Sequence, residues 1–213
     1  MSKIKLTKGE LKRQRDSLKQ FQHYLPTLQL KKQQLQMKIL EARQKLAERQ
    51  KALEEKESFI NRWVGLLADP LLAFATPGLD FKKWLTPQEI KVEQINIAGA
   101  RISIFKDITF SAVEYDYYTT PLWVDHALVE LRAFVAILAE MSVINRQIAI
   151  LQQELRVTTQ RVNLFEKIKI PESRNNIRII RIYLGDQQAN AVGISKVAKG
   201  KISNSLLEEM AII

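Results

Sequence analysis

The amino-acid sequence predicts a mainly α-helical protein: a long antiparallel two-helix coiled coil with a short middle segment that contains a β-hairpin. Three observations over the 213 residues lead to this fold class. Two long stretches, 10–64 and 122–170, are almost free of glycine and proline, and each carries a narrow apolar stripe with a seven-residue period. The region between them collects seven Gly and Pro residues and changes to the alternating pattern of β-strands.

The first coiled-coil helix is expected within residues 1–63. Thr7 stands three positions before Glu10, a spacing typical of a capping box at the start of a helix. Pro26 lacks an amide donor and is expected to bend this helix in its first third. Apolar side chains recur in steps of three and four, which predicts a narrow helix–helix seam. They are Leu11, Leu18, Phe21, Leu25, Leu28, Leu35, Ile39, Ala42, Leu46, Leu53, Ile60 and Trp63.

The middle segment, residues 64–123, is expected to hold the β-hairpin. β-Branched residues alternate on both sides of Ala98-Gly99, a pattern that predicts two strands and a tight turn. Apolar strand residues and neighbouring aromatics together indicate a docking surface for a partner protein. Its residues are Ile95, Ile97, Ile102, Ile104, Tyr115, Tyr117 and Tyr118. Trp123 is expected to pack at the base of the helix pair instead.

The second coiled-coil helix is expected at 124–184, followed by a C-terminal tail at 185–213. Thr120 suits a helix cap and Pro121 the first helical position. The stripe slips by about one position near Ser142, which is expected to loosen the supercoil there. Its residues are Val124, Leu128, Leu131, Val135, Leu138, Met141, Ile148, Leu151, Leu155, Val162 and Phe165. Because the two arms have similar lengths, antiparallel pairing within one chain is favoured over a parallel homodimer.

Composition and charge narrow the function classes. The net charge is +10, and the first 62 residues hold sixteen Lys/Arg against seven Asp/Glu. Such a surplus suits nucleic acid, an anionic membrane, an acidic protein surface or a solvated helix face. The chain has no cysteine, and its two histidines, His23 and His126, fall near opposite ends of the expected helix pair. We therefore expect no catalytic residue, no metal site and no cofactor.

The apolar runs of the sequence are short. Uncharged apolar runs such as 63–68 fall far below the roughly 20 residues that span a bilayer. The N-terminal lysines are not followed by an apolar core, so no signal peptide is predicted. A cytoplasmic protein is expected.

Several blocks of the sequence resemble the D subunit of V-type (archaeal/vacuolar-type) ATPases. The Arg-Val-Asn-Leu-Phe-Glu-Lys run at 161–167, followed by Ile170-Pro171 and Asn176-Ile177-Arg178, is similar to the C-terminal helix of that family. Residues 25–32 resemble its N-terminal helix. The Asn-Ile-Ala-Gly block at 96–99 and the Thr-Pro-Leu-Trp-Val-Asp block at 120–125 resemble the middle segment of bacterial members. The resemblance spans residues 5–200 in the expected order.

The resemblance implies a non-catalytic rotor shaft in the central stalk. Such a shaft transmits torque between the catalytic head and the membrane ion-translocating ring of a V-type ATPase/ATP synthase. The implied partners are the A and B subunits of the head, the F subunit of the stalk and a funnel-like subunit on the rotor ring, which makes the chain peripheral to the membrane. The F subunit is expected on the lower helix pair and the 90–118 segment.

The family's orientation, with both terminal helices inside the head, implies a second contact surface made of cations. These are Lys12, Arg13, Arg15, Lys31, Lys32, Arg161, Arg174 and Arg178. They are expected to meet acidic groups of the surrounding catalytic subunits in turn.

Two alternatives share the same helices. A coiled-coil adaptor or tether has no need of the 161–167 block. A basic nucleic-acid-binding rod would use the N-terminal charge surplus, and its affinity would fall steeply with salt. The basic residues are spread around the helix instead of gathered on one face, so no nucleic-acid partner is expected.

Overall fold

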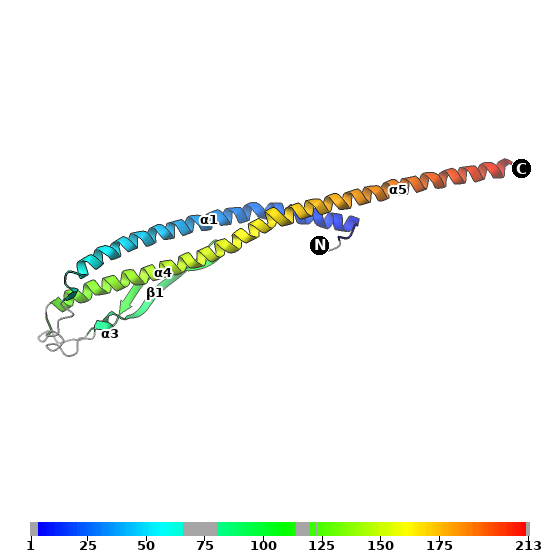
Figure 1. Cartoon of the computed structure of the whole chain (residues 1–213). Helices are drawn as coiled ribbons and strands as arrows, with labels where there is room; N and C mark the ends of the chain where they lie inside the picture. Colours follow the sequence, from blue (N-terminus) through cyan, green and yellow to red (C-terminus); the bar gives the residue numbers. More distant parts are fainter. Residues whose placement is uncertain (1–3, 66–80, 114–119, 122, 212–213) are drawn as a thin grey trace. The chain divides into compact units, whose positions relative to one another are not determined.

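The computed structural model describes residues 4–65, 81–113, 120–121 and 123–211 (Figure 1). The chain divides into two compact units. The first unit combines Met1–Leu30 with Thr159–Ile213, and the second is Lys31–Thr158. The elements, in chain order, are α1 (Lys8–Ile60), α3 (Phe81–Leu85), β1 (Pro87–Ile97), β2 (Ala100–Phe110), α4 (Trp123–Asn163), the π-helix η2 (Leu164–Lys169) and α5 (Ile170–Ala211). The predicted fold class, long helices with one short hairpin, is confirmed.

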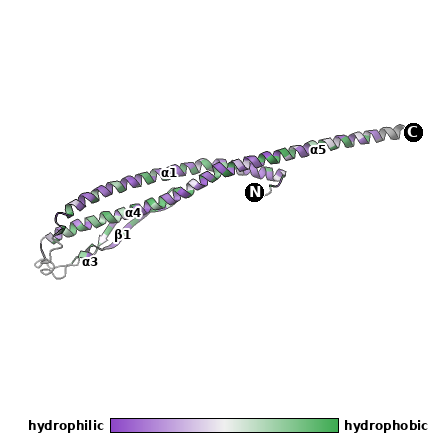
Figure 2. Cartoon of the chain, in the orientation of Figure 1, coloured by the Kyte–Doolittle hydropathy of each residue, from purple (hydrophilic) through white to green (hydrophobic). Residues whose placement is uncertain are grey.

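Helix α1 runs through both units and begins as the sequence predicts. The backbone N–H of Glu10 donates to the Thr7 Oγ1 atom at 3.2 Å, which is the expected cap. Every predicted stripe position from Leu11 to Trp63 is buried or half-buried, and apolar and polar residues alternate along the helix (Figure 2). Its 53 residues correspond to about 80 Å of helix. Pro26 lies inside this helix, and the bend expected there stays a prediction.

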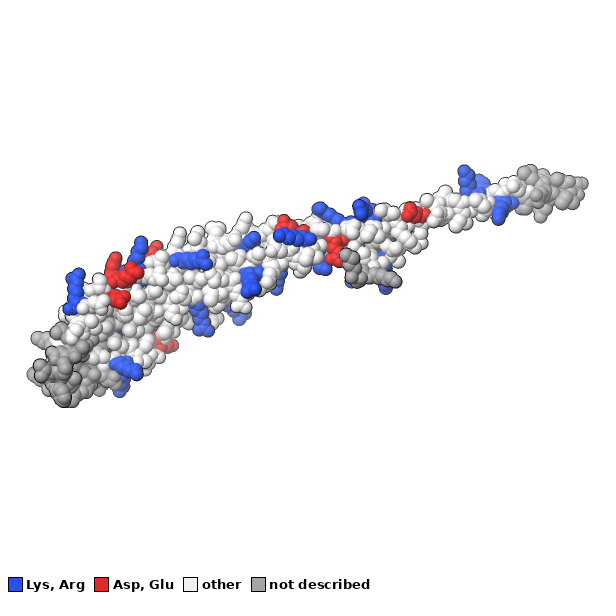
Figure 3. Space-filling view, in the orientation of Figure 1, with Lys and Arg blue, Asp and Glu red and all other residues white. Residues whose placement is uncertain are grey.

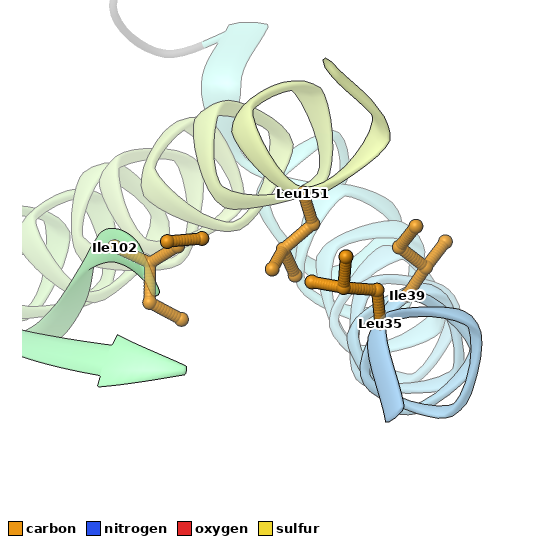
Figure 4. Close-up of a cluster of buried hydrophobic side chains, with 5 residues drawn as sticks. Leu35, Ile39, Ile102 and Leu151 are labelled. Carbon is orange, nitrogen blue, oxygen red and sulfur yellow. The ribbon is translucent and has the colours of Figure 1, made fainter. Parts of the chain in front are cut away.

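In the second unit, α1 and α4 pair in an antiparallel manner. Leu35 and Ile39 of α1 point toward Leu151 of α4, and Ile102 of β2 closes the same cluster (Figure 4). The Leu35 side chain is 0% exposed. Residues near 35 thus meet residues near 151, the register that the matched arm lengths predict. The antiparallel coiled coil within one chain is confirmed.

The β-hairpin has the turn that its sequence predicts. β1 pairs with β2 in an antiparallel manner, with Ile95 opposite Ile102. Ala98 and Gly99 have φ values of 50° and 85°, as a type I′ turn requires. The Gly99 amide donates to the Asn96 Oδ1 atom at 2.9 Å, which closes the turn. Ala100 and Ile102 are buried, so the hairpin is anchored to the helix pair through β2.

A second core of the same unit lies where α4 begins. Trp84 of α3 is buried with Val124 and Leu128, and Trp123 packs against them. The Trp123 ring stacks 6.5 Å from the Phe81 ring, which confirms the packing role expected for Trp123. Short helix α3 has no counterpart in the sequence analysis. α4 begins at Trp123, one residue before the predicted bound of 124, so Pro121 precedes the helix instead of occupying its first position.

In the first unit, the N-terminal part of α1 packs against η2 and α5. The rings of Phe21 and Phe165 stack at 5.3 Å, and the Asn176 side-chain amide donates to the Gln14 Oε1 atom at 3.5 Å. In η2 the Ile170 amide donates to the Phe165 carbonyl, five residues back. The apolar stripe takes a five-residue step from Phe165 to Ile170, and the wider π-turn absorbs the extra residue.

Two features of the second long arm differ from the sequence analysis. The sequence pattern places Leu138 in the stripe, but its side chain is exposed, and Glu140 is buried two residues further on. The register therefore changes before Ser142. In addition, α5 continues past Leu184 to Ala211, so residues 185–211, set apart as a tail, are helical.

Cysteines placed at Leu46 and Met141 are expected to form a disulfide within one chain. Both side chains are half-buried on the facing helices of the second unit, and their numbers fit the observed register. Because the chain has no native cysteine, non-reducing electrophoresis reads the result without background. Matched cysteines at Leu40 and Met141 are the control, since Leu40 is exposed. Crosslinks found between chains but not within them would contradict the in-chain pairing.

Candidate functional site

Ion pairs join α1 to α4 in the second unit, and they are sorted by charge. Lys31 lies 3.9 Å from Glu154, and Lys56 lies 2.6 Å from Glu130. In each pair α1 supplies the cation and α4 the anion. Two α1 helices brought together would place like charges opposite each other, which destabilises such a pairing. The arrangement therefore favours pairing within one chain in one register.

Glu140 is the centre of this ladder. Its carboxylate lies 3.2 Å from the Lys45 Nζ atom and 2.9 Å from the Arg49 Nε atom. The Glu140 side chain is 11% exposed, whereas the two cations are about half exposed. A buried carboxylate needs such partners because its desolvation is costly. Sequence reasoning missed this cluster. The sequence holds one indication of this cluster. Glu140 occupies a position that the antiparallel register turns toward the first helix, where Lys45 and Arg49 lie one turn apart.

The double variant Lys45→Met/Arg49→Met is expected to lower the free energy of unfolding by about 2 kcal/mol, because it leaves the Glu140 carboxylate buried and unpaired. Methionine keeps most of the apolar stem of each side chain. Adding Glu140→Met should restore most of the loss, as measured by urea unfolding. The control Lys56→Met removes a more exposed pair and should cost less than about 1 kcal/mol. A triple variant no more stable than the double one would contradict this explanation.

The predicted head-contact cations divide between the two units. Lys12, Arg13 and Arg15 on α1 are exposed in the first unit. The predicted contact cations of the second arm, Arg161, Arg174 and Arg178, are exposed in the same unit. Lys31 and Lys32 are half-buried and belong to the second unit. The Lys31 Nζ atom lies 3.4 Å from the point where a Cβ on Gly99 would sit, so Lys31 neighbours the hairpin turn.

The predicted docking residues also differ in their exposure. The Ile95 side chain is 38% exposed, and Ile97 and Ile104 are half-buried. Ile102 is 4% exposed and fills the helix–hairpin core, so it is not available to a partner and is dropped from the docking surface. Tyr115, Tyr117 and Tyr118 lie outside the described residues. Sequence reasoning missed Ile90 and Val92 as surface residues, although their alternation with Lys91 was visible.

The last part of α5 presents apolar side chains that the sequence analysis did not single out. From Gly185 to Asn204 every side chain is exposed, including Val192, Ile194 and Val197. Apolar side chains at this level of exposure are typical of surfaces that another protein covers.

The part of the chain that the structure describes contains neither a metal-binding cluster nor a membrane-spanning helix. Within those residues, His, Asp and Glu side chains form no group of three that would hold a metal ion. The same residues include no helix long and apolar enough to cross a membrane. Figure 3 shows Lys and Arg side chains interspersed with Asp and Glu on the visible face, without a continuous basic stripe.

A family model for the D subunit of ATP synthases matches residues 10–200. The chain belongs to this ATP synthase D-subunit family. The V-type ATP synthase D subunit of Borreliella burgdorferi is 41% identical over 202 residues, which cover 95% of this chain and 96% of the relative. The Chlamydia felis protein of the same name is 34% identical, with 94% of both chains covered. That of Chlamydia pneumoniae is 33% identical, with 93% of both covered.

Membership in this family makes the chain a subunit of a V-type ATPase and connects it with ATP synthesis and ion transport. The resemblance on which the sequence analysis relied is confirmed, including its bacterial branch. Two of the sequence blocks that resemble the family, 96–99 and 161–167, can now be placed in the structure. The first ends in the hairpin turn, and the second covers the last residues of α4 and the first four of η2.

Proposed function

We propose that the chain is the rotor shaft of the central stalk, which transmits torque between the catalytic head and the membrane ion-translocating ring. Family membership supports a place in a V-type ATPase, and the pairing of the two long helices supports a mechanical role. The observation that carries the proposal is the charge-sorted antiparallel pairing of α1 with α4 around buried Glu140. Two helices fixed in one register resist sliding past each other, and a torque-bearing element requires this.

The first unit is proposed to enter the head formed by the A and B subunits. The six predicted contact cations that are exposed in this unit suit acidic surfaces, and exposed ion pairs are weak enough to be exchanged as the shaft turns. The apolar residues of α5 near Val192 and Val197 suit a covered position at the end of the helix. Lys31 and Lys32 belong to the proposed contact set, but their location in the second unit makes them its weakest members.

The second unit is proposed to hold the F subunit of the stalk through the hairpin, and a funnel-like subunit to join it to the rotor ring. The exposed apolar residues Ile90, Val92 and Ile95 support a partner at the hairpin. In this role the chain carries out no bond chemistry, binds no cofactor or nucleic acid, and is cytoplasmic and peripheral to the membrane through the complex.

Copurification tests the proposal. The full chain, coexpressed with the A, B and F subunits, should form a stable complex that survives gel filtration at physiological salt. Deleting residues 90–110 should weaken the binding of F and leave the binding of A and B intact. Full affinity for F after this deletion would contradict the docking site. Salt-sensitive binding to DNA, together with no affinity for the ATPase subunits, would contradict the shaft.

A further inference from the structure

A polar cavity of about 550 Å³ lies within the first unit, between the N-terminal part of α1 and the junction of η2 with α5. It forms where the apolar seam of this unit is interrupted. Gln14 stands in α1 between the stripe residues Leu11 and Leu18, and the buried Ser173 and Asn176 of α5 line the same cavity. The Ser173 side chain is smaller than the leucine or isoleucine that fills the seam elsewhere, so it leaves space between the helices. The volume is in the range of ligand-binding cavities.

Two serine hydroxyls that line this cavity, those of Ser17 and Ser173, form no hydrogen bond within the described residues. Elsewhere in the long helices, the hydroxyls of Ser58 and Ser195 donate to a carbonyl of the preceding turn, at 2.7 and 2.8 Å. Ser173 is only 5% exposed, yet no fully enclosed side-chain oxygen of the described residues lacks a partner. The Ser173 hydroxyl therefore opens into the cavity, where a ligand can supply the bond that a buried polar group needs.

The charged groups of the cavity leave two cations unpaired. Lys169 lies 3.4 Å from Glu172, so these two compensate each other. The Glu10 carboxylate accepts a bond from a glutamine amide at 2.8 Å but has no cation beside it. Lys5 and Arg13 form no ion pair within the described residues. Because a guanidinium and an ammonium group are donors only, the two cations and the two hydroxyls give the cavity an excess of unused hydrogen-bond donors.

We propose that this cavity is an oxyanion site, which takes a carboxylate or a phosphate group. Arg13 and Lys5 supply the charge, and Ser17 and Ser173 supply neutral donors. Hydrogen bonds from a cation to an oxyanion are among the strongest in proteins, and a guanidinium matches both oxygens of such a group. In contrast to the exposed cations of the same unit, this set of donors surrounds a defined space and includes a buried one.

Two sources can provide the oxyanion. One is an acidic side chain of the catalytic head, and the other is free phosphate. The first source rests on the proposed function, because it requires the first unit to enter the head. The oxyanion site itself does not depend on that function, so the two can be tested separately.

A titration of the full chain with inorganic phosphate at constant ionic strength tests the site. The backbone amide signals of Ser17 and Ser173 in NMR spectra should shift in a saturable manner, and that of Ser58 should not. Ser173→Ala should weaken phosphate binding about fourfold and Arg13→Gln about tenfold. Ser58→Ala and Lys19→Gln are the matched controls, since they remove a hydroxyl and a positive charge outside the cavity, and each should change the affinity less than about twofold.

Copurification with the A and B subunits distinguishes the two sources. If an acidic group of the head occupies the cavity, Ser173→Ala should weaken the binding of A and B about fourfold and Ser58→Ala should not. If both variants bind A and B as the wild type does while phosphate still binds, free phosphate is the ligand and the site stands.

Two results would overturn the oxyanion site. One is a phosphate response that does not saturate, and the other is equal weakening by Arg13→Gln and Lys19→Gln, which would reduce the effect to general attraction by positive charge. Neither result bears on the shaft function. Failure of the wild-type chain to bind A and B would contradict the shaft function and the head as a source, whereas saturable phosphate binding would still support the site.

Discussion

Replacing Leu35 with alanine is expected to lower the free energy of unfolding of the second unit by about 3 kcal/mol. The Leu35 side chain is fully buried and contacts residues of three elements, α1, α4 and β2 (Figure 4). Its removal leaves a cavity at the point where the hairpin meets the helix pair. Because these elements are held by other contacts as well, they will close the cavity only in part.

The measurement is tryptophan fluorescence during urea unfolding. Trp63, Trp84 and Trp123, all the tryptophans of the chain, fall within the second unit, so the signal reports on that unit. Leu40→Ala is the matched control, since it makes the same change on the same helix at a side chain 58% exposed. It should cost less than about 0.5 kcal/mol. Equal losses for the two variants would contradict the packing described.

Removing four exposed cations of the first unit together is expected to uncouple ATP hydrolysis from rotation. The variant replaces Arg15, Arg161, Arg174 and Arg178 with glutamine. Each exposed ion pair contributes about 0–1 kcal/mol, so Arg161→Gln alone should reduce torque or turnover by less than about fivefold. Four such losses act on the same contact and should leave hydrolysis that no longer drives ion transport. Reconstituted complexes allow both rates to be measured.

A control separates this effect from a loss of net charge. Replacing Arg43, Lys51, Arg62 and Arg146 with glutamine removes the same charge from exposed positions of the second unit. This variant should stay coupled. Wild-type coupling in the first variant, or equal uncoupling in both, would leave the cations of the first unit with only a role in solubility.

The helices and the hairpin were predictable because their signals are local. A seven-residue apolar repeat from Leu11 to Trp63 is typical of a helix that packs along a narrow seam against another helix. Alternation around Ala98-Gly99 similarly predicts a hairpin, since glycine accepts the positive φ of the second turn position. The register followed from the equal lengths expected for the two arms, although the second arm continues past Leu184 to Ala211.

Features that depend on contacts across the fold were not predictable from such patterns. Whether Ile102 faces a partner or the core depends on which edge of the hairpin meets α4, and alternation alone does not settle this. Glu140 looks like a solvated flank residue until Lys45 and Arg49 are placed opposite it. The five-residue step from Phe165 to Ile170 was visible, but a π-turn, a helix break and a register slip all produce it.

The central claim is that this chain turns inside the ATPase, and rotation of single molecules tests it most directly. A cysteine introduced at exposed Arg62 would be the sole thiol of the chain and would carry a bead, with the head fixed to the surface. We expect ATP to drive steady rotation of the bead in one direction. A bead that stays still while the head hydrolyses ATP at its full rate would contradict the shaft function.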